Sequence, residues 1–176
     1  MLAAPKGNQT RPTSDKVREA MFNILGEPPS RVLDLFAGSG LLGIEALSRG
    51  ASAVHFVDSS KTACRQIQRN IESLSASEST QVLCSTVIKA LPRLERPFGW
   101  IFLDPPYSKG LVEEVLIKIS RKHLDLIEPS GLIIAEHETR LDIPQSIEQL
   151  ERVDLRHYGD SSVSFFKPRG ENQSLQ

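Results

Sequence analysis

The sequence has few cysteines and histidines, and their spacing excludes the common metal-binding motifs. Its 176 residues include two cysteines, Cys64 and Cys84, and four histidines. A structural zinc site needs convergent cysteine or histidine ligands at short spacing, and this chain does not offer them. We therefore expect no metal, and we interpret both cysteines as small buried hydrophobic residues.

Long apolar runs are also lacking. No run approaches the ~20 residues that a membrane-spanning helix needs, and residues 1–9 hold no hydrophobic signal-peptide core. We expect a monomer that stays in the cytoplasm. The net charge is only −1, which counts against a strongly basic nucleic-acid binder, although a local basic patch can still supply phosphate contacts.

What the sequence does contain is an alternation of strand and helix patterns. An arm and a first helix (14–25) occupy residues 1–30, and the polar residues 170–176 are expected to fray. Further along the chain we predict strands at 31–36, 52–57, 80–84, 99–103 and 131–136, helices at 40–49, 61–74, 87–94, 111–124 and 145–150, and a hairpin from 153–158 and 162–167. This order predicts one α/β domain over 1–176, with a doubly wound, mostly parallel sheet and a C-terminal antiparallel hairpin.

A glycine-rich turn follows the first predicted strand. Residues 38–43 read Gly-Ser-Gly-Leu-Leu-Gly, which matches G-x-G-x-x-G, and Asp58 ends the next strand. This context is typical of a site for an adenosine-containing cofactor, whose ribose hydroxyls the acidic residue binds. The pattern alone leaves a dinucleotide dehydrogenase open.

Asp34 favours a different cofactor. It stands four residues before Gly38, where a carboxylate would repel a pyrophosphate but could pair with the ammonium of an amino acid. S-adenosylmethionine carries such an ammonium and has no phosphate. The alternative is that Asp34 only caps the turn or the following helix, as short polar side chains often do.

The tetrapeptide Asp104-Pro105-Pro106-Tyr107 follows the fourth predicted strand. In an open α/β sheet, ligands bind beyond the carboxyl ends of the strands where the strand order reverses, so this segment should face the glycine turn. Taken alone, it could also be a plain strand-end turn.

These four residues suit chemistry on the exocyclic amine of a base. Such an amine is a poor nucleophile because its lone pair is delocalised into the ring. Asp104 can accept an N–H hydrogen bond and localise that lone pair. The stiff Pro105-Pro106 turn can offer a carbonyl oxygen to the second hydrogen, and Tyr107 can stack on the base.

The two loops resemble the cofactor and catalytic motifs of amino-methyltransferases with the Rossmann-like class I S-adenosylmethionine-dependent fold. Residues 11–25 closely resemble the N-terminal signature of the RsmD family, and residues 158–162 (Tyr-Gly-Asp-Ser-Ser) are similar to that family's end. The resemblance covers nearly the whole chain. It implies methyl transfer from S-adenosylmethionine to N2 of a guanine in 16S ribosomal RNA of the assembling small subunit.

The resemblance also implies roles for individual residues. Those implied to hold the cofactor are Asp34, Phe36, Ala37, Gly38, Ser39, Gly40, Asp58, Ser59, Ser85, Thr86, Arg11 and Thr13. Those implied to hold the target amine and base are Asp104, Pro105, Pro106 and Tyr107. Lys16 and Arg18, like Arg11, are implied to lie near the RNA or the cofactor, and the resemblance does not separate these two roles. An ordinary solvated helix face would also carry such residues.

Two features depart from the family pattern. Family members usually carry an acidic or amide residue after the third strand, where it meets the adenine amino group, whereas this chain has Cys84-Ser85-Thr86. The family also has a basic segment before the point where this chain starts, and residues 1–10 resemble only its end.

Two further functions fit the same fold. The tetrapeptide alone also fits an adenine-N6 DNA methyltransferase, and a non-catalytic nucleic-acid-binding module could keep the whole architecture. The intact residues 104–107 argue against such a module, since binding alone does not require them. We therefore expect an rRNA (guanine-N2)-methyltransferase.

Overall fold

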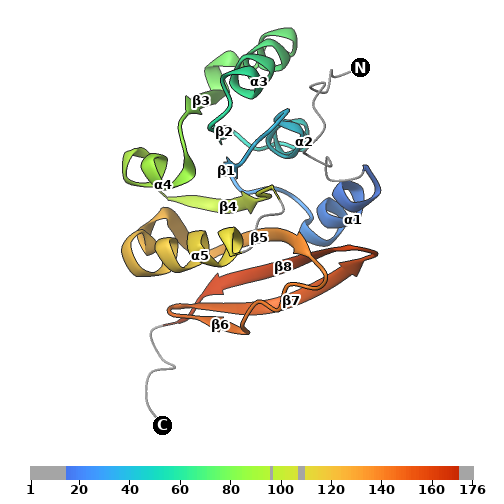
Figure 1. The fold of residues 1–176 in the computed structure, drawn as a ribbon. Coiled ribbons are helices and arrows are strands. Elements are labelled where there is room, and N and C mark those ends of the chain that lie inside the picture. The colour runs from blue at the N-terminus through green and yellow to red at the C-terminus, as the bar shows by residue number, and fades with distance from the viewer. Residues whose placement is uncertain (1–14, 96, 107–109, 171–176) are drawn as a thin grey trace.

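An eight-stranded mixed sheet with helices on both faces forms the centre of the computed structural model (Figure 1). The structure describes residues 15–95, 97–106 and 110–170. The strands are β1 (Arg31–Leu35), β2 (Ala53–Asp58), β3 (Thr80–Cys84), β4 (Phe98–Leu103), β5 (Ile127–Glu138), β6 (Ser146–Ile147), β7 (Leu150–Tyr158) and β8 (Ser161–Pro168). The helices are α1 (Asp15–Leu25), α2 (Leu41–Ser48), α3 (Lys61–Ser73), α4 (Val87–Ala90) and α5 (Leu111–Lys122), with 3₁₀ turns η1 (Ser77–Ser79), η2 (Leu91–Arg93) and η3 (Leu124–Leu126).

The strand order is β3-β2-β1-β4-β5-β8-β7-β6. The first five strands of the chain pair in parallel, whereas β8, β7 and β6 add antiparallel pairs. The order reverses between β1 and β4, which is the switch point of a doubly wound sheet. The predicted architecture is confirmed: a Rossmann-like doubly wound sheet, mostly parallel with a C-terminal antiparallel hairpin.

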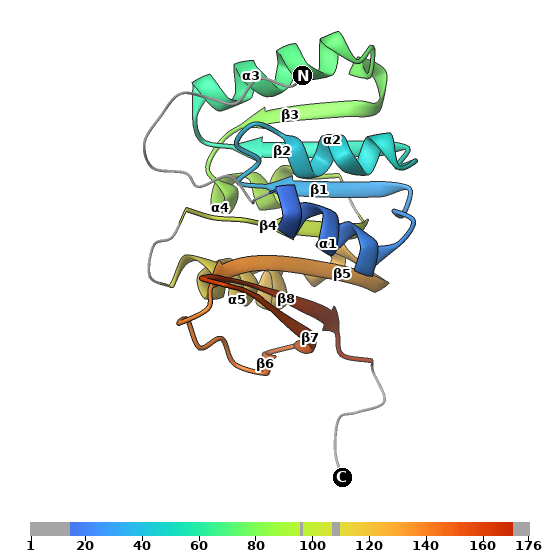
Figure 2. The same cartoon turned by 90° about the vertical axis from the view of Figure 1, so that its right-hand side faces the viewer.

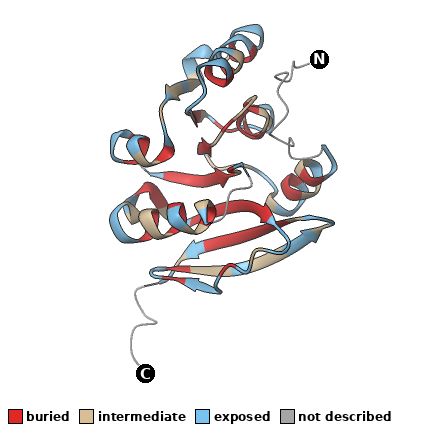
Figure 3. Ribbon diagram, viewed as in Figure 1, coloured by how far each residue is buried: buried red, intermediate tan, exposed pale blue. Residues whose placement is uncertain are grey.

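Each face of the sheet carries its own core. Alternate side chains of a strand point to opposite faces, so Leu33 and Leu35 join the core under α4 and α5, whereas Val32 joins the core under α1, α2 and α3. Figure 3 shows the buried residues concentrated on the central strands and on the helix sides that meet them. The sheet is thus held rigidly from both sides, and its carboxyl edge is left for a ligand.

Helix α1 packs on one face of the sheet and contacts β4. Val17, Met21 and Phe22 form its buried side, and the Phe22 ring meets Trp100 edge to face at 6.2 Å between centroids. Figure 2 shows α1 running back along β1, so its first turn lies toward the carboxyl ends of the parallel strands.

The predicted helix at 145–150 is wrong. These residues form β6 and the first residue of β7, a short hairpin with a left-handed Glu148 (φ 53°) between them. Two hydrogen bonds from Gln149 to Ser120 tie this turn to α5. Because Ile147 and Leu150 are three residues apart, their spacing suits a helix as well as a hairpin, and the packing against α5 decides between them.

The β7–β8 hairpin is confirmed around Gly159, which has φ 66°. The pairing of β7 with β8 shifts register between Arg152 and Asp154, which marks a bulge. The hairpin tip is bound to the end of β5, since Thr139 donates its backbone N–H to Asp160 O at 2.8 Å and its hydroxyl to Gly159 O at 2.9 Å. The family-like residues 158–162 therefore lie at the carboxyl edge of the parallel strands.

Candidate functional site

The carboxyl ends of β1 and β4 lie side by side. Leu35 at the end of β1 pairs with Leu103 at the end of β4, so the chain continues from both strands at the same edge. The glycine turn follows Leu35, and Asp104 follows Leu103. The predicted adjacency of these two segments at the switch point is confirmed, because β1 and β4 are hydrogen-bonded neighbours (Figure 2).

The turn after β1 has a backbone that side chains disfavour. Phe36 (φ 60°), Gly38 (φ 56°) and Gly40 (φ 79°) all lie in the left-handed region. The turn is closed by a hydrogen bond of 2.7 Å from Gly40 N to Ala37 O, and Ala37 N donates to Val57 O at 3.0 Å. The left-handed conformation therefore favours glycine at positions 38 and 40. Phe36 adopts the same conformation at the start of the turn and is strained there.

Asp58 joins the glycine turn to the start of α3. Its Oδ2 accepts from Gly38 N at 2.8 Å, and its Oδ1 accepts from Ser60 N at 2.7 Å. The residue is only partly buried. Each carboxylate oxygen has a second lone pair, so Asp58 can still accept hydrogen bonds from the hydroxyls of a bound ribose.

Asp34 is 1% exposed and binds the first turn of α2. Its Oδ2 accepts a hydrogen bond from Gly43 N at 2.9 Å. Asp34 therefore caps the following helix, which was the alternative to binding a ligand ammonium. Burial raises the pKa of Asp34 to about 7, the Gly43 N–H opposes this, and the Asp58 carboxylate adds to it. A direct contact between Asp34 and a ligand ammonium stays a prediction.

Two further contacts hold the turn against its neighbours. A Cβ placed on Gly43 would lie 2.3 Å from Cε1 of Phe56, so only glycine allows α2 to approach β2 this closely. The buried Asn70 of α3 donates from Nδ2 to Ser39 O at 3.1 Å. Sequence reasoning missed Asn70, and the signal that could have found it is a polar residue within the apolar stripe of α3.

The residues after β3 also lie at this edge. Ser85 N donates to Asp58 O at 2.9 Å, which places the Ser85 backbone beside the end of β2. Thr86 is the exposed N-cap residue of α4, and its side chain makes no capping hydrogen bond. Their proposed contact with an adenine stays a prediction.

The expectation for the two cysteines is confirmed for one and wrong for the other. Cys64 is buried as predicted, whereas Cys84 is exposed. The reason is that β3 is an edge strand, so a residue at its end is covered by fewer neighbours. The fold also brings the two thiols together: burial raises the pKa of Cys64 to about 12, and a hydrogen bond with the Cys84 side chain contributes to the rise.

The residues after β4 differ in burial. Asp104 is half-buried and makes contacts of its own, Pro105 is buried and Pro106 is exposed. Tyr107 lies outside the described residues, as do Arg11 and Thr13. The exposed Ser59 continues the chain from Asp58 into the cap of α3.

The register of β4 and β5 brings a second acidic residue, Glu136, level with Asp104. Leu103 pairs with Ala135 across β4 and β5, so the next residues in register are Asp104 and Glu136. Glu136 is 7% exposed although it is an acidic residue near the end of a strand. Sequence reasoning missed it, and the signal was an acidic residue near the end of a predicted strand, at the same edge as Asp58 and Asp104.

The two basic residues of α1 take different positions. Lys16 is exposed, whereas the side chain of Arg18 is 19% exposed and its Nη1 lies 2.9 Å from Oδ1 of Asp15. That contact is an ion pair without an aligned hydrogen bond. Lys16 is thus the residue of the two whose charge faces solvent.

Within residues 15–95, 97–106 and 110–170, no three His, Cys, Asp or Glu side chains converge as metal ligands would. No helix in the same ranges has the length and apolar character to cross a membrane.

Comparison with known proteins places the chain among relatives of similar length. A family model described as "Conserved hypothetical protein 95" matches residues 1–167. YlbH of Bacillus subtilis (strain 168), provisionally named an rRNA methyltransferase, is 38% identical over 174 residues, which cover 96% of this chain and 94% of that protein. "Ribosomal RNA small subunit methyltransferase D" of Escherichia coli (strain K12) is 34% identical over 151 residues, covering 81% of this chain and 72% of that protein.

The chain belongs to the RsmD family. A solved structure with the same fold is a conserved hypothetical protein of Streptococcus pyogenes, with 33% identity and a TM-score of 0.79 over 91% of this chain and 100% of that one. As a member of the RsmD family the chain is a methyltransferase, and the switch point between β1 and β4 is where its candidate site lies.

Proposed function

We propose that this chain transfers the methyl group of S-adenosylmethionine to N2 of a guanine in the 16S ribosomal RNA of assembling small subunits. The observation that carries the proposal is the placement of Asp104-Pro105-Pro106 beside the glycine turn, in a member of the RsmD family. The relative named "Ribosomal RNA small subunit methyltransferase D" supports the RNA substrate.

The turn and its neighbours fit an adenosine-containing methyl donor. The left-handed Gly38 and Gly40 keep side chains away from the place where the ligand backbone approaches, and Asp58 offers lone pairs to ribose hydroxyls. The buried acidic residue Asp34 below the turn disfavours a pyrophosphate there. When bound, the sulfonium supplies the electrophilic methyl group, and that chemistry needs no metal.

The segment after β4 would hold the nucleophile. The Asp104 carboxylate accepts one N–H of the guanine amine, which localises the nitrogen lone pair, and it can take the proton that the amine loses on methylation. The Pro105 carbonyl, held stiffly by the following proline ring, can accept the other N–H. Holding the amine in one geometry toward the donor supplies much of the rate.

Glu136 favours guanine over adenine. The Watson–Crick edge of guanine presents two adjacent donors, N1–H and N2–H, whereas adenine presents one donor and one acceptor. Two carboxylates side by side, Asp104 and Glu136, suit the guanine edge. An adenine ring would bring its N1 lone pair against a carboxylate, which is repulsive.

A labelled-methyl assay with nucleoside analysis tests the proposal. The protein is incubated with labelled S-adenosylmethionine and small ribosomal subunits that lack methylation, and the RNA is then digested to nucleosides. We expect label in N2-methylguanosine. Label in N6-methyladenosine would support the adenine-N6 alternative, and binding of S-adenosylhomocysteine with no label in RNA would refute the RNA substrate.

A further inference from the structure

Helix α3 carries a row of basic residues on its outer side. Lys61, Arg65 and Arg69 are all exposed and stand four residues apart, which places successive charges about 6 Å apart along the helix. The opposite side of α3 is buried through Cys64, Ile67 and Ile71. We call the three basic residues the α3 stripe.

Among the residues that the structure describes, the three side chains of the α3 stripe have no acidic partner. By contrast, five arginines elsewhere in the described ranges lie within ion-pair distance of a carboxylate: Arg18, Arg31, Arg49, Arg121 and Arg156. Within the part of the chain that the structure describes, no carboxylate lies within 4.0 Å of a stripe side chain. The stripe therefore presents three uncompensated positive charges, although the whole chain has a net charge of −1.

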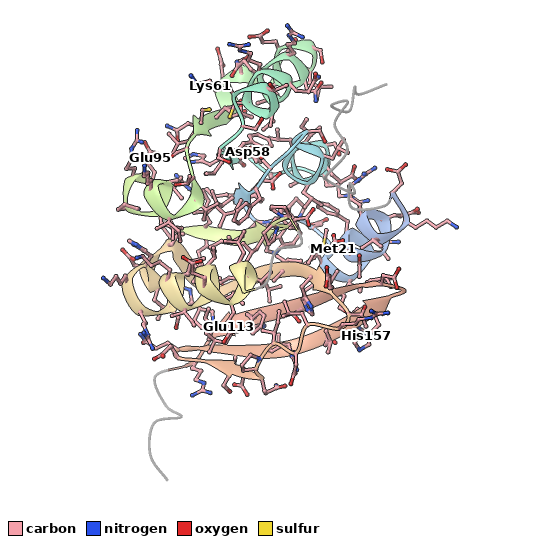
Figure 4. The ribbon with its side chains drawn as sticks, viewed as in Figure 1. Met21, Asp58, Lys61, Glu95, Glu113 and His157 are labelled. Carbon is pink, nitrogen blue, oxygen red and sulfur yellow. The ribbon has the colours of Figure 1, made fainter. Side chains whose placement is uncertain are left out.

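The stripe begins at the candidate site. Lys61 is the first residue of α3 and follows Ser60, whose N–H binds the Asp58 carboxylate. Figure 4 labels Asp58 at the end of β2 and Lys61 at the start of α3. Because α3 packs on β2 and β3, the stripe runs from the carboxyl edge of the sheet along its outer margin.

We propose that the α3 stripe binds the phosphate backbone of the substrate RNA beside the nucleotide that is methylated. This inference rests on the proposed function. Phosphate contacts supply most of the sequence-independent affinity of a nucleic-acid binder, and unpaired lysine and arginine side chains are the groups that make them. The rigid, buried inner side of α3 holds the three charges in line, so no ordering of the helix is needed on binding.

Two charge-matched triple variants test the proposal. The first is K61Q/R65Q/R69Q on α3. The control is R93Q/K118Q/K122Q, which removes the same charge from η2 and α5 on the other side of the sheet. Filter binding of deproteinised small-subunit rRNA is measured from low to high salt, together with the methylation kinetics, S-adenosylhomocysteine binding and thermal unfolding.

We expect the α3 variant to raise KM for rRNA about tenfold at physiological salt and to lower the slope of log K against log salt by about 2, which corresponds to three lost phosphate contacts. Its kcat at saturating rRNA, S-adenosylhomocysteine affinity and unfolding temperature should match those of the unmodified protein. The control variant should keep the original slope.

Equal slopes in the two triple variants would overturn the α3 proposal, whether or not the unmodified protein methylates rRNA. Absence of rRNA methylation by the unmodified protein would instead refute the proposed function. Polyglutamate that competes as well as rRNA at equal charge would assign the stripe to an acidic protein partner, and would also overturn the proposal.

Discussion

Asn70 of α3 donates a hydrogen bond to the Ser39 carbonyl oxygen, and this bond links the third helix to the tip of the glycine turn. The Asn70 Oδ1 atom accepts from Gln66 Nε2 at 3.0 Å, which fixes the orientation of the amide. The conformation of the turn therefore depends on a residue more than thirty positions away in the sequence.

Replacing Asn70 with alanine should weaken S-adenosylhomocysteine binding about fivefold. The variant loses a buried hydrogen bond that contributes about 1 kcal/mol, so the ligand must order the glycine turn when it binds. Isothermal calorimetry measures this. Gln68→Ala is the control, since Gln68 bonds only to the exposed Glu72 on the outer side of α3. An affinity in the Asn70→Ala variant equal to that of the control would contradict the role.

Asp34 predicts a pH dependence of stability. Its pKa rises from 3.8 in the unfolded chain to about 7 in the fold because it is buried. The folded state thus binds more protons between pH 4 and 7, so the contribution of Asp34 to stability is full below about pH 4 and is lost as the pH rises through 7.

The Asp34→Asn variant should lack this dependence, because the asparagine oxygen can still accept from Gly43 N. At pH 8 it should be more stable than the unmodified protein by up to about 4 kcal/mol. Urea unfolding at pH 5 and pH 8 measures the difference, with the exposed Asp142→Asn as control. Parallel pH profiles for the Asp34→Asn variant and the unmodified protein would disprove the assignment.

Gly43→Ala should destabilise the fold by about 1–3 kcal/mol, because the added methyl group would overlap the Phe56 ring and the Val54 side chain. Chemical denaturation measures the loss. A Cβ on Gly170 meets no atom within 4 Å, so Gly170→Ala should leave the stability unchanged. A neutral Gly43→Ala variant would show that α2 can move away from β2 at little cost.

Asp104→Ala should abolish turnover and leave S-adenosylhomocysteine affinity within about twofold, since the residue acts on the target amine and not on the cofactor. Single-turnover methyl transfer and calorimetry on the same sample separate the two effects. Full activity in this variant would remove Asp104 from the proposed mechanism.

Glu136→Gln should lower kcat/KM for rRNA at least tenfold, because the side-chain amide is a weaker and less directional acceptor for the guanine N1–H. Binding of S-adenosylhomocysteine should not change. The matched variant is Glu138→Gln, an exposed residue two positions further along β5. An equal loss in both variants would point to a general charge effect.

Periodicity and motif order were enough to predict the sheet, because glycine, proline and alternating apolar residues report on local backbone and burial. They could not predict contacts that depend on packing between distant segments. Asn70 reaches Ser39 only because α3 lies against the turn, and Glu136 comes level with Asp104 only through the register of β4 and β5. The hairpin at Ile147 and Leu150 was likewise decided by α5, not by local spacing.

The bulge between Arg152 and Asp154 limits how far another strand could pair with the outer margin of β7. Beyond its short pairing with β6, this strand leaves a row of backbone groups that another chain could extend into a shared sheet. The bulge interrupts the regular hydrogen-bonding pattern of the strand, and the Arg156–Asp154 ion pair places charged side chains along that margin. The strand is therefore a poor template for aggregation, even though the sheet is open on this side.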